Sequence, residues 1–309
     1  VFGGIFTVLN LPLSYYVGYV LPHRFQQSNQ ELKAWVIDLI KGLLVSAILG
    51  GFVLEAIYFL LRSAPGSWWL WAAGFLLIFN VILSNLAPVV LFPIFYQFTP
   101  LAEEDKALGE RLMALAERAG APVMGVFRFD MSRRTKSANA GLTGLGNTRR
   151  IILGDTLLDE FTPGEIETVL AHELGHHVNR DIPLGIIVGT GITLGGLYLT
   201  SLVLNWGVNA FGYQSVSDLA ALPLFAICLG MYSLLTSPLS NGFSRWRERL
   251  ADTYALQLTG AGTTYASALK RLSNQNLADV DPPAWAEFFL HSHPSLQKRI
   301  HRAENFSPK

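Results

Sequence analysis

The distribution of charged residues constrains the fold of this 309-residue chain more than any other feature. Four stretches contain no Asp, Glu, Lys or Arg and together account for 125 residues: 1–23, 63–102, 182–217 and 219–244. The 46 charged side chains lie in the other 184 residues, at about the one-in-four density of ordinary soluble domains. Uncharged stretches of this length are typical of membrane-spanning helices. The sequence therefore predicts a mainly α-helical, multi-span integral membrane protein with soluble segments between its spans.

Five segments of about 20 residues are apolar enough to cross a bilayer. They lie at about 1–21, 43–61, 69–92, 183–206 and 219–239. The loop between the first two spans carries three basic residues, Arg24, Lys33 and Lys41. The loop at 207–218 carries none. Because Lys and Arg favour the cytoplasmic side, we expect the region 93–182 and the tail from residue 240 to face the cytoplasm, from a plasma, inner or ER-type membrane.

Composition excludes a nucleic-acid-binding protein and any site built from several cysteines. The net charge is zero and no basic run exceeds two residues, so nothing predicts a nucleic-acid partner. The single cysteine, Cys228, cannot form an intrachain disulfide or a thiolate metal cluster, so any metal must be held by His and carboxylates. Residue 1 is Val and opens directly into an apolar run, so we expect the membrane domain to be truncated at its N-terminus.

The chain divides into four predicted parts. We expect an N-terminal membrane domain of about three spans over 1–98, a small folded domain over 99–181, two further spans over 182–240 and a helical part over 241–309. In the folded domain, Thr99-Pro100 predicts a helix start, and Leu108, Leu112 and Leu115 form its apolar stripe. Strands are predicted at 123–130, 137–145 and 150–154, with a turn at Gly146-Asn147, giving a small sheet that is antiparallel at least in its hairpin.

A second helix in this domain carries the motif most informative about chemistry. Thr162 and Glu165 form a capping-box signature that predicts a helix over 163–180. On it stands His172-Glu173-Leu174-Gly175-His176, an H-E-x-x-H pattern. Histidines four residues apart project from one helical face and can bind one Zn²⁺ together. Glu173 is placed to take a proton from zinc-bound water and deliver it to a leaving amine. His177 is rotated by about 100° and is expected to take no part.

A catalytic zinc needs a third protein ligand, and Glu248 is the candidate. It lies in a predicted helix over 241–258, with Asn241 as cap and Gly260 past its end. Asp252 follows one turn later on the same face and can accept a hydrogen bond from a ligand histidine. On spacing alone, Glu248 could equally belong to a solvated ion-pair run with the neighbouring arginines.

The sequence resembles the type I CaaX prenyl protease family, integral-membrane zinc metallopeptidases of the gluzincin type. The similarity extends over nearly the whole chain, beyond the H-E-x-x-H motif. Matching segments are Leu11-Pro12-Leu13-Ser14-Tyr15-Tyr16, His23-Arg24-Phe25, Phe98-Thr99-Pro100-Leu101, Ser137-Ala138-Asn139-Ala140, Arg150-Ile151-Ile152-Leu153, Asp155-Thr156-Leu157-Leu158, Glu248-Arg249-Leu250-Ala251-Asp252 and His293-Pro294-Ser295-Leu296 with Arg299.

The resemblance implies a fold class, a cofactor and a set of site residues. It implies a helical membrane protein with a small α+β gluzincin-like domain and one Zn²⁺ per chain. The implied ligands are His172, His176 and Glu248, with Glu173 as base and Asp252 supporting a ligand histidine. Asn139 would hold the substrate backbone along an edge strand. His293 and Arg299 would contact the substrate carbonyl or the developing oxyanion; from the residues alone, they could be a helix cap and a surface charge.

Two departures from the family pattern bear on the substrate. The family usually has seven spans around an intramembrane chamber, whereas five are predicted here. Family members often place an aromatic residue just beyond the Asn-Ala pair, where this chain has Gly141-Leu142. The substrate class therefore stays open between removal of the C-terminal tripeptide after a prenylated cysteine and turnover of membrane proteins.

Two other functions compete with a membrane-embedded zinc endopeptidase acting at the cytoplasmic side. An intramembrane site-two-type protease also uses H-E-x-x-H, but here charged residues flank the motif, which places it outside the uncharged spans. His176 lies six residues before Ile182, about 9 Å of helix rise, so the site should lie close to the bilayer and act on membrane-tethered polypeptides. A transporter or scaffold with structural zinc would need a fourth protein ligand, and only His177 is near.

Overall fold

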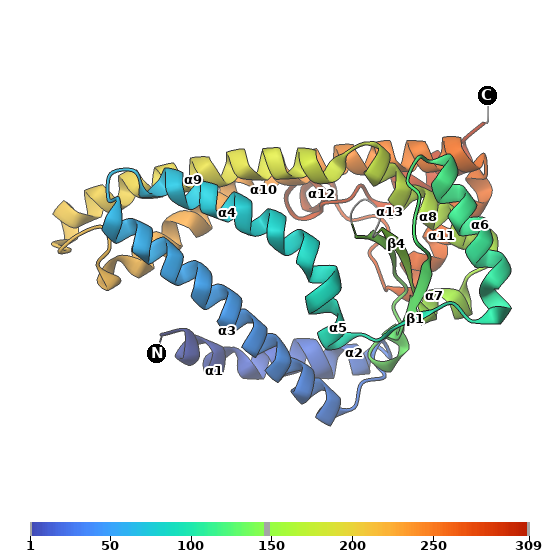
Figure 1. The fold of residues 1–309 in the computed structure, drawn as a ribbon, viewed down its shortest axis with the longest axis horizontal. Helices are drawn as coiled ribbons and strands as arrows, with labels where there is room; N and C mark the ends of the chain where they lie inside the picture. The colour runs from blue at the N-terminus through green and yellow to red at the C-terminus, as the bar shows by residue number, and fades with distance from the viewer. Residues whose placement is uncertain (1, 145–148, 308–309) are drawn as a thin grey trace.

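A computed structural model describes residues 2–144 and 149–307 of the chain. Most of the long helices lie toward one end and the sheet with its covering helices toward the other, and α10 (Leu222–Thr259) extends along both (Figure 1). Within the described residues, five helical segments are long and apolar enough to cross a membrane: Gly3–Arg24, Leu32–Ser63, Trp68–Phe95, Asp181–Phe211 and Leu219–Thr259. The five predicted spans are confirmed as helices, and most extend several residues beyond their predicted ends.

Two of the first three spans are interrupted by a π-helical turn that lies next to or contains a proline. Helix α1 (Phe2–Tyr15) continues through a π-helical turn into α2 (Leu21–Arg24), and α3 (Leu32–Ser63) is unbroken. Helix α4 (Trp68–Leu86) reaches α5 (Phe92–Phe95) through a second π-helical turn, which contains Pro88. Proline has no N–H to continue the α-helical ladder, and the wider turn accommodates it. A buried cluster around Trp68 joins α3 and α4 to α9 (Asp181–Phe211).

The sheet has four strands in the order β1-β2-β4-β3, which leaves β3 at an edge. The strands are β1 (Phe98–Pro100), β2 (Val126–Phe129), β3 (Ala140–Thr143) and β4 (Arg150–Gly154). The β3–β4 pair is antiparallel, as predicted for the hairpin, whereas β2 and β4 run parallel. The predicted turn at Gly146-Asn147 lies outside the described residues.

Helices cover the sheet and enclose its core. They are α6 (Lys106–Arg118), α7 (Asp155–Glu160), α8 (Pro163–Val178), α11 (Gly262–Gln275) and α13 (Leu296–Glu304), whereas the short α12 (Ala284–Leu290) packs on α10. The predicted stripe of Leu108, Leu112 and Leu115 is buried in this core, together with Leu170 and Leu174 of α8. The core therefore fixes the helix that carries the H-E-x-x-H motif.

The predicted helix start at Thr99-Pro100 is wrong. These residues belong to β1, where Pro100 pairs with Phe127 of β2, and α6 begins only at Lys106 after a short 3₁₀ turn. Proline is compatible with an edge strand because no neighbouring strand needs its missing N–H. Phe98 stacks on Phe129 with 5.8 Å between ring centroids, which favours the strand.

The predicted cap at Asn241 is also wrong, because α10 (Leu222–Thr259) runs without a break from the last membrane span to the end of the Glu248 helix. Asn241 does not cap; its Nδ2 donates to the carbonyl of Phe289 at 2.7 Å. Pro238 lies inside the helix without ending it. The predicted boundary between residues 240 and 241 therefore falls within one helix, which ends at Gly260 with a positive φ, as expected.

Candidate metal centre

Helix α8 begins where the capping box predicts. Glu165 Oε2 accepts a hydrogen bond from the backbone N–H of Thr162 at 2.9 Å, and Thr162 Oγ1 accepts one from the N–H of Glu165. The helix ends at Val178, two residues before the predicted end. Its buried side packs into the core of the folded domain, and His172 and His176 point from it toward α10. The cap thus sets the start of a rigid support for both histidines.

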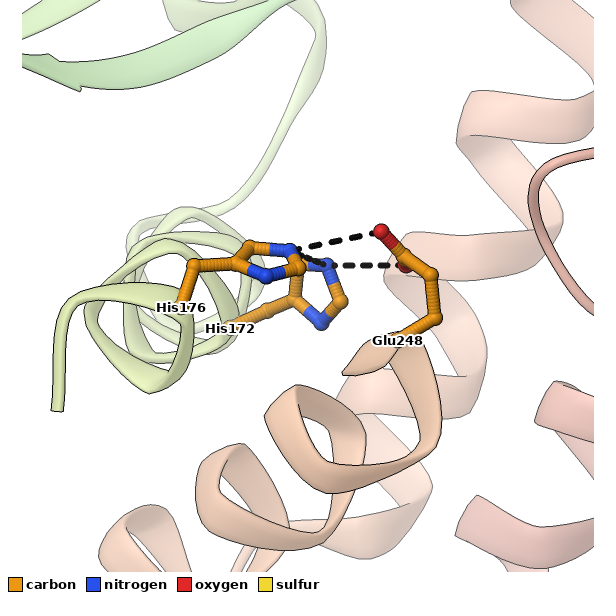
Figure 2. Close-up of side chains that lie close together, drawn as sticks. All are labelled: His172, His176 and Glu248. Carbon is orange, nitrogen blue, oxygen red and sulfur yellow. Dashed lines mark hydrogen bonds and ion pairs between the residues drawn. The ribbon is translucent and has the colours of Figure 1, made fainter. Parts of the chain in front are cut away.

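Three side chains converge between α8 and α10 (Figure 2). His172, His176 and Glu248 each offer one ligand atom, and these atoms lie within 4.8 Å of one another. The Nε2 atoms of the two histidines are 3.1 Å apart, and each lies 3.4 Å from an oxygen of Glu248. Glu248 is only 5% exposed, which excludes the alternative that it belongs to a solvated run.

A glycine inside the motif allows the two helices to meet. A Cβ added to Gly175 would lie 2.8 Å from the Cα of Ala251 and 2.9 Å from its carbonyl oxygen. Such distances are far inside van der Waals contact, so only glycine permits this approach. Ala251 stands between Glu248 and Asp252 on α10, so the close contact brings both carboxylates to the histidines. The sequence analysis did not identify this role of Gly175.

The donor set fits a divalent metal. Glu248 Oε2 is buried and has no hydrogen-bond donor among the described residues. A buried carboxylate oxygen without a donor is costly unless a cation completes its surroundings. Two imidazole nitrogens and one carboxylate form a three-ligand set that leaves a position open, as in catalytic zinc sites.

His172 is oriented by a buried network that we name the core flank: Asp252, Tyr265 and Arg299. His172 Nδ1 lies 2.9 Å from Asp252 Oδ1, which directs Nε2 toward Glu248. The hydroxyl of Tyr265 donates to the same oxygen at 2.6 Å, and Arg299 donates to both oxygens at 2.7 and 3.0 Å. Burial lowers the pKa of His172, but the adjacent carboxylates of Asp252 and Glu248 outweigh it and raise the pKa above its usual value.

His176 faces a second pair that we name the membrane flank: Asp181 and Arg247. His176 Nδ1 lies 2.7 Å from Asp181 Oδ2, and Arg247 Nε donates to Asp181 Oδ1 at 2.7 Å. Asp181 is the first residue of the membrane helix α9. Burial lowers the pKa of His176, but hydrogen bonds to Glu248 and Asp181 outweigh it and raise the pKa to about 9.

The remaining predicted site residues line a cavity of about 260 Å³ beside the ligands. Asn139, Glu173, His293 and Arg299 all contribute to its wall. His293 Nε2 lies 3.2 Å from Glu248 Oε1, and its side chain is 57% exposed, so it faces the open side of the site. The side chain of Arg299 is only 11% exposed, which excludes a surface charge, and its guanidinium donates to both oxygens of Asp252.

A larger groove of about 710 Å³ meets this cavity at Glu173, which lines both. Its walls are mostly apolar residues of α4 and α9, and His176 and His177 lie at the same end as Glu173. Asn139 and Ala140, at the start of β3, face the cavity, whereas Leu142 and Gly144 line the groove. The edge strand therefore passes from one hollow to the other alongside Glu173.

Three supporting residues were missed by the sequence analysis: Tyr265, Asp181 and Arg247. Asp181 lies five residues after His176, and a carboxylate so close to a ligand histidine was a usable signal. Arg247 directly precedes Glu248 and was read only as part of a charged run. Nothing in the sequence around Tyr265 distinguished it from a core tyrosine.

The chain resembles known membrane proteases along its whole length. Residues 102–307 match the family model described as peptidase family M48, and residues 1–97 match one described as "CAAX prenyl protease N-terminal, five membrane helices". The chain is 31% identical to the uncharacterized metalloprotease YhfN of Bacillus subtilis, covering 97% of this chain and 71% of the relative. It is 31% identical to CAAX prenyl protease 1 of Saccharomyces cerevisiae, covering 98% and 70%.

A solved structure shows the same fold. The crystal structure of S. mikatae Ste24p matches with a TM-score of 0.89 and 28% sequence identity, covering 99% of this chain and 74% of that one. The predicted resemblance is therefore confirmed, and with it the predicted fold class of a helical membrane protein with a small sheet-containing domain.

Proposed function

We propose that this chain, which belongs to peptidase family M48 and is a membrane metallopeptidase, uses one zinc ion to cleave membrane-tethered polypeptides beside the bilayer. The observation that carries the proposal is the meeting of three features at Glu173: the ligand cluster, the edge of β3 and the apolar groove. A transporter or scaffold with structural zinc is not favoured, because no fourth ligand joins the cluster among the described residues.

The residues divide the chemistry between them. His172, His176 and Glu248 hold the metal, which when bound supplies Lewis-acid polarisation of the scissile carbonyl. The carboxylate of Glu173 accepts a proton from the attacking water and delivers it to the leaving amine. His293, on the open side, donates a hydrogen bond from Nε2 to the developing oxyanion. Arg299 acts at a distance, by holding Asp252 against His172.

An extended peptide can add to the sheet along β3. The strand lies at the sheet edge, and its first residues are tied to β4 because Asn139 O accepts from Gly154 N at 2.9 Å. Peptides commonly bind such an edge by strand pairing. Asn139, in the cavity wall at the start of β3, would hold the peptide backbone there. The peptide would then run past Glu173 toward the groove.

The groove is suited to the membrane-attached part of the substrate. Gly185 and Gly189 of α9 line it, and a Cβ at either position would meet open space. Ala73, Leu76 and Leu77 of α4 form the facing wall. An apolar hollow between membrane helices that opens at the catalytic carboxylate supports a lipidated substrate, such as a polypeptide with a prenylated cysteine, over a soluble one.

The catalytic side of the membrane is the cytoplasmic side in this proposal. The basic residues between the first two spans and the absence of Lys and Arg from 207–218 support that orientation. Since Cys228 is the only cysteine, a Cys228→Ser background allows a single reporter thiol. Asp159→Cys on α7 should resist a membrane-impermeant maleimide in intact cells and react after lysis. Reaction in intact cells would show that the catalytic domain faces away from the cytoplasm.

The central test is hydrolysis by the purified protein in detergent, with and without a chelator. Glu173→Gln should keep about one equivalent of zinc while cleavage of a quenched peptide falls by about 10²–10⁴. Asp159→Asn, an exposed carboxylate change on α7, is the matched control and should leave cleavage unchanged. Full activity in Glu173→Gln would remove the mechanism, as would activity that survives the chelator.

Two further variants test the substrate path. Asn139→Ala should raise KM with zinc content unchanged, and loss of zinc would show that Asn139 has a different role. Gly189→Leu should fill the groove and raise KM for a prenylated peptide by about tenfold, or ~1.4 kcal/mol, without affecting the same peptide lacking its lipid. Gly191→Leu, on the same helix but outside the groove lining, is the control. Equal effects on both peptides would place the lipid elsewhere.

A further inference from the structure

The second histidine of the motif depends on a residue that belongs to the membrane part of the chain. His176 must present a lone pair on Nε2 to bind a metal, so its proton has to lie on Nδ1. The acceptor facing Nδ1 is Asp181 Oδ2, at 2.7 Å. A carboxylate in this position fixes both the tautomer and the angle of the imidazole ring.

Asp181 is itself held on both of its oxygens. Oδ2 faces His176, and Oδ1 accepts from Arg247, whose Nε lies 2.7 Å away and whose terminal nitrogen also contacts it. The same terminal nitrogen donates to the carbonyl of Asn179, in the turn that precedes Asp181. Arg247 is only 7% exposed. The guanidinium therefore fixes both the side chain and the turn on which it is carried.

The backbone brings Asp181 back toward the end of α8. Arg180 adopts a left-handed conformation with φ of 57°, a strained value for a residue with a side chain. This residue separates α8 from α9, and the first residue of the membrane helix consequently lies beside the last ligand of α8. The strain is maintained by the contacts of Asp181 and Asn179 with Arg247 on α10.

We infer that Asp181 is a positioning residue for the ligand His176 and that Arg247 clamps it there, so that the start of membrane helix α9 completes the metal site. A simpler role is available to the same residue. An aspartate in the first turn favours a helix through the helix dipole, and its pairing with Arg247 ties α9 to α10. That structural role predicts a loss of thermal stability without a specific loss of metal affinity.

The inference rests on the metal site proposed above, and its test therefore measures metal binding and not hydrolysis. Full-length protein in detergent is stripped of metal, and zinc affinity is measured by competition with a chromophoric chelator. Asp181→Ala should weaken zinc binding by about 10–100-fold. The visible spectrum of the cobalt-loaded protein should change as well, because the ring of His176 is no longer held. Asp181→Asn keeps an acceptor oxygen and should lose less zinc affinity than Asp181→Ala.

Two controls separate the possible outcomes. Glu248→Ala should lose zinc almost completely; if it binds normally, the metal site itself is wrong. If Glu248→Ala loses zinc but Asp181→Ala binds within threefold of the unmodified protein, the positioning role alone is overturned, whatever the change in melting temperature. Arg247→Met should weaken binding less than Asp181→Ala, and their double variant should be no weaker than Asp181→Ala. If Asp181→Ala does not fold, an unchanged zinc affinity in both Asp181→Asn and Arg247→Met overturns the inference.

Discussion

The two histidines of one motif are held by regions of different kinds. The core flank orients His172 through Asp252, a residue 2% exposed that is fixed by the folded domain. The membrane flank orients His176 through Asp181, which opens a membrane helix. The sequence spacing makes the two histidines equivalent, but the residues that hold them belong to different parts of the molecule. The comparison indicates that one side of the metal site depends on the soluble core and the other on the position of α9 against α10.

The largest effect is expected where both flanks meet. Glu248 faces both histidines, with an oxygen 3.4 Å from each Nε2, so Glu248→Ala leaves two imidazoles that cannot complete a three-ligand site. Zinc content measured by atomic emission should fall from about one equivalent to nearly none after dialysis. Retention of zinc in this variant would mean that His172, His176 and Glu248 are not the ligand set.

The next effect separates the core flank from the membrane flank. Asp252→Asn should weaken zinc binding by about 10–100-fold, with binding restored by excess zinc. It should also lower the apo-protein melting temperature more than Asp181→Asn does. Both substitutions unpair a largely buried arginine, which typically costs about 3–5 kcal/mol. Apart from the histidines, however, Asp252 accepts from both Tyr265 and Arg299, and its side chain is 3% exposed. Asp181 accepts from Arg247 alone among the described residues, and its side chain is 13% exposed. Equal melting temperatures in the two variants would remove the distinction between the flanks.

A smaller effect tests whether the core flank acts through Asp252. Tyr265→Phe removes the hydroxyl that donates to Asp252 at 2.6 Å, a hydrogen bond to a charged group worth about 1.5–3 kcal/mol. Zinc affinity should fall by several-fold, and the double variant with Asp252→Asn should bind zinc no more weakly than Asp252→Asn alone. Tyr254→Phe, a partly buried tyrosine of α10, serves as the control. Independent, additive losses would show that Tyr265 does not act through Asp252.

The smallest effect concerns a buried carboxylate outside both flanks. Burial raises the pKa of Glu165, but hydrogen bonds from Ser267 and Thr162 and the charge of Arg271 outweigh it, so the pKa lies below its usual 4.5. The ionised form thus stabilises the fold above the usual pKa, and this contribution is lost as pH falls through the lowered one. Glu165→Gln should cost about 1 kcal/mol at pH 7, less in strong acid, with zinc affinity unchanged. A loss that does not diminish in acid would contradict this account.

The features that could be predicted from the sequence are those with a local signal. The absence of charge revealed the spans, the capping box of Thr162 and Glu165 revealed the start of α8, and the motif supplied two candidate ligands. The third ligand was a choice between two interpretations of Glu248 until the resemblance and then the packing of α8 on α10 favoured one. Local sequence patterns are therefore sufficient to predict individual helices, but not the contacts between helices.

The features that could not be predicted depend on chain segments that are distant in the sequence. Tyr265 lies 93 residues from His172, and its hydroxyl contacts the ring only because α11 packs beside α8. Thr99-Pro100 has the local signature of a helix start, but pairing with β2 determines its conformation. Asn241 similarly has the signature of a helix cap, yet α10 runs through it, and its side chain bonds to the carbonyl of Phe289 in a distant segment.

The unbroken course of α10 links the height of the metal site to the thickness of the bilayer. Leu239 ends the apolar stretch of this helix, and Glu248 follows nine residues later, about 13 Å along the same axis. A single helix moves as one rod, so the lipid that sets the depth of its apolar part also sets the distance of Glu248 from the membrane surface. Under the proposed function, the reach from the membrane to the scissile bond would thus be a fixed length, and substrates would be selected by how far their cleavage site lies from their anchor.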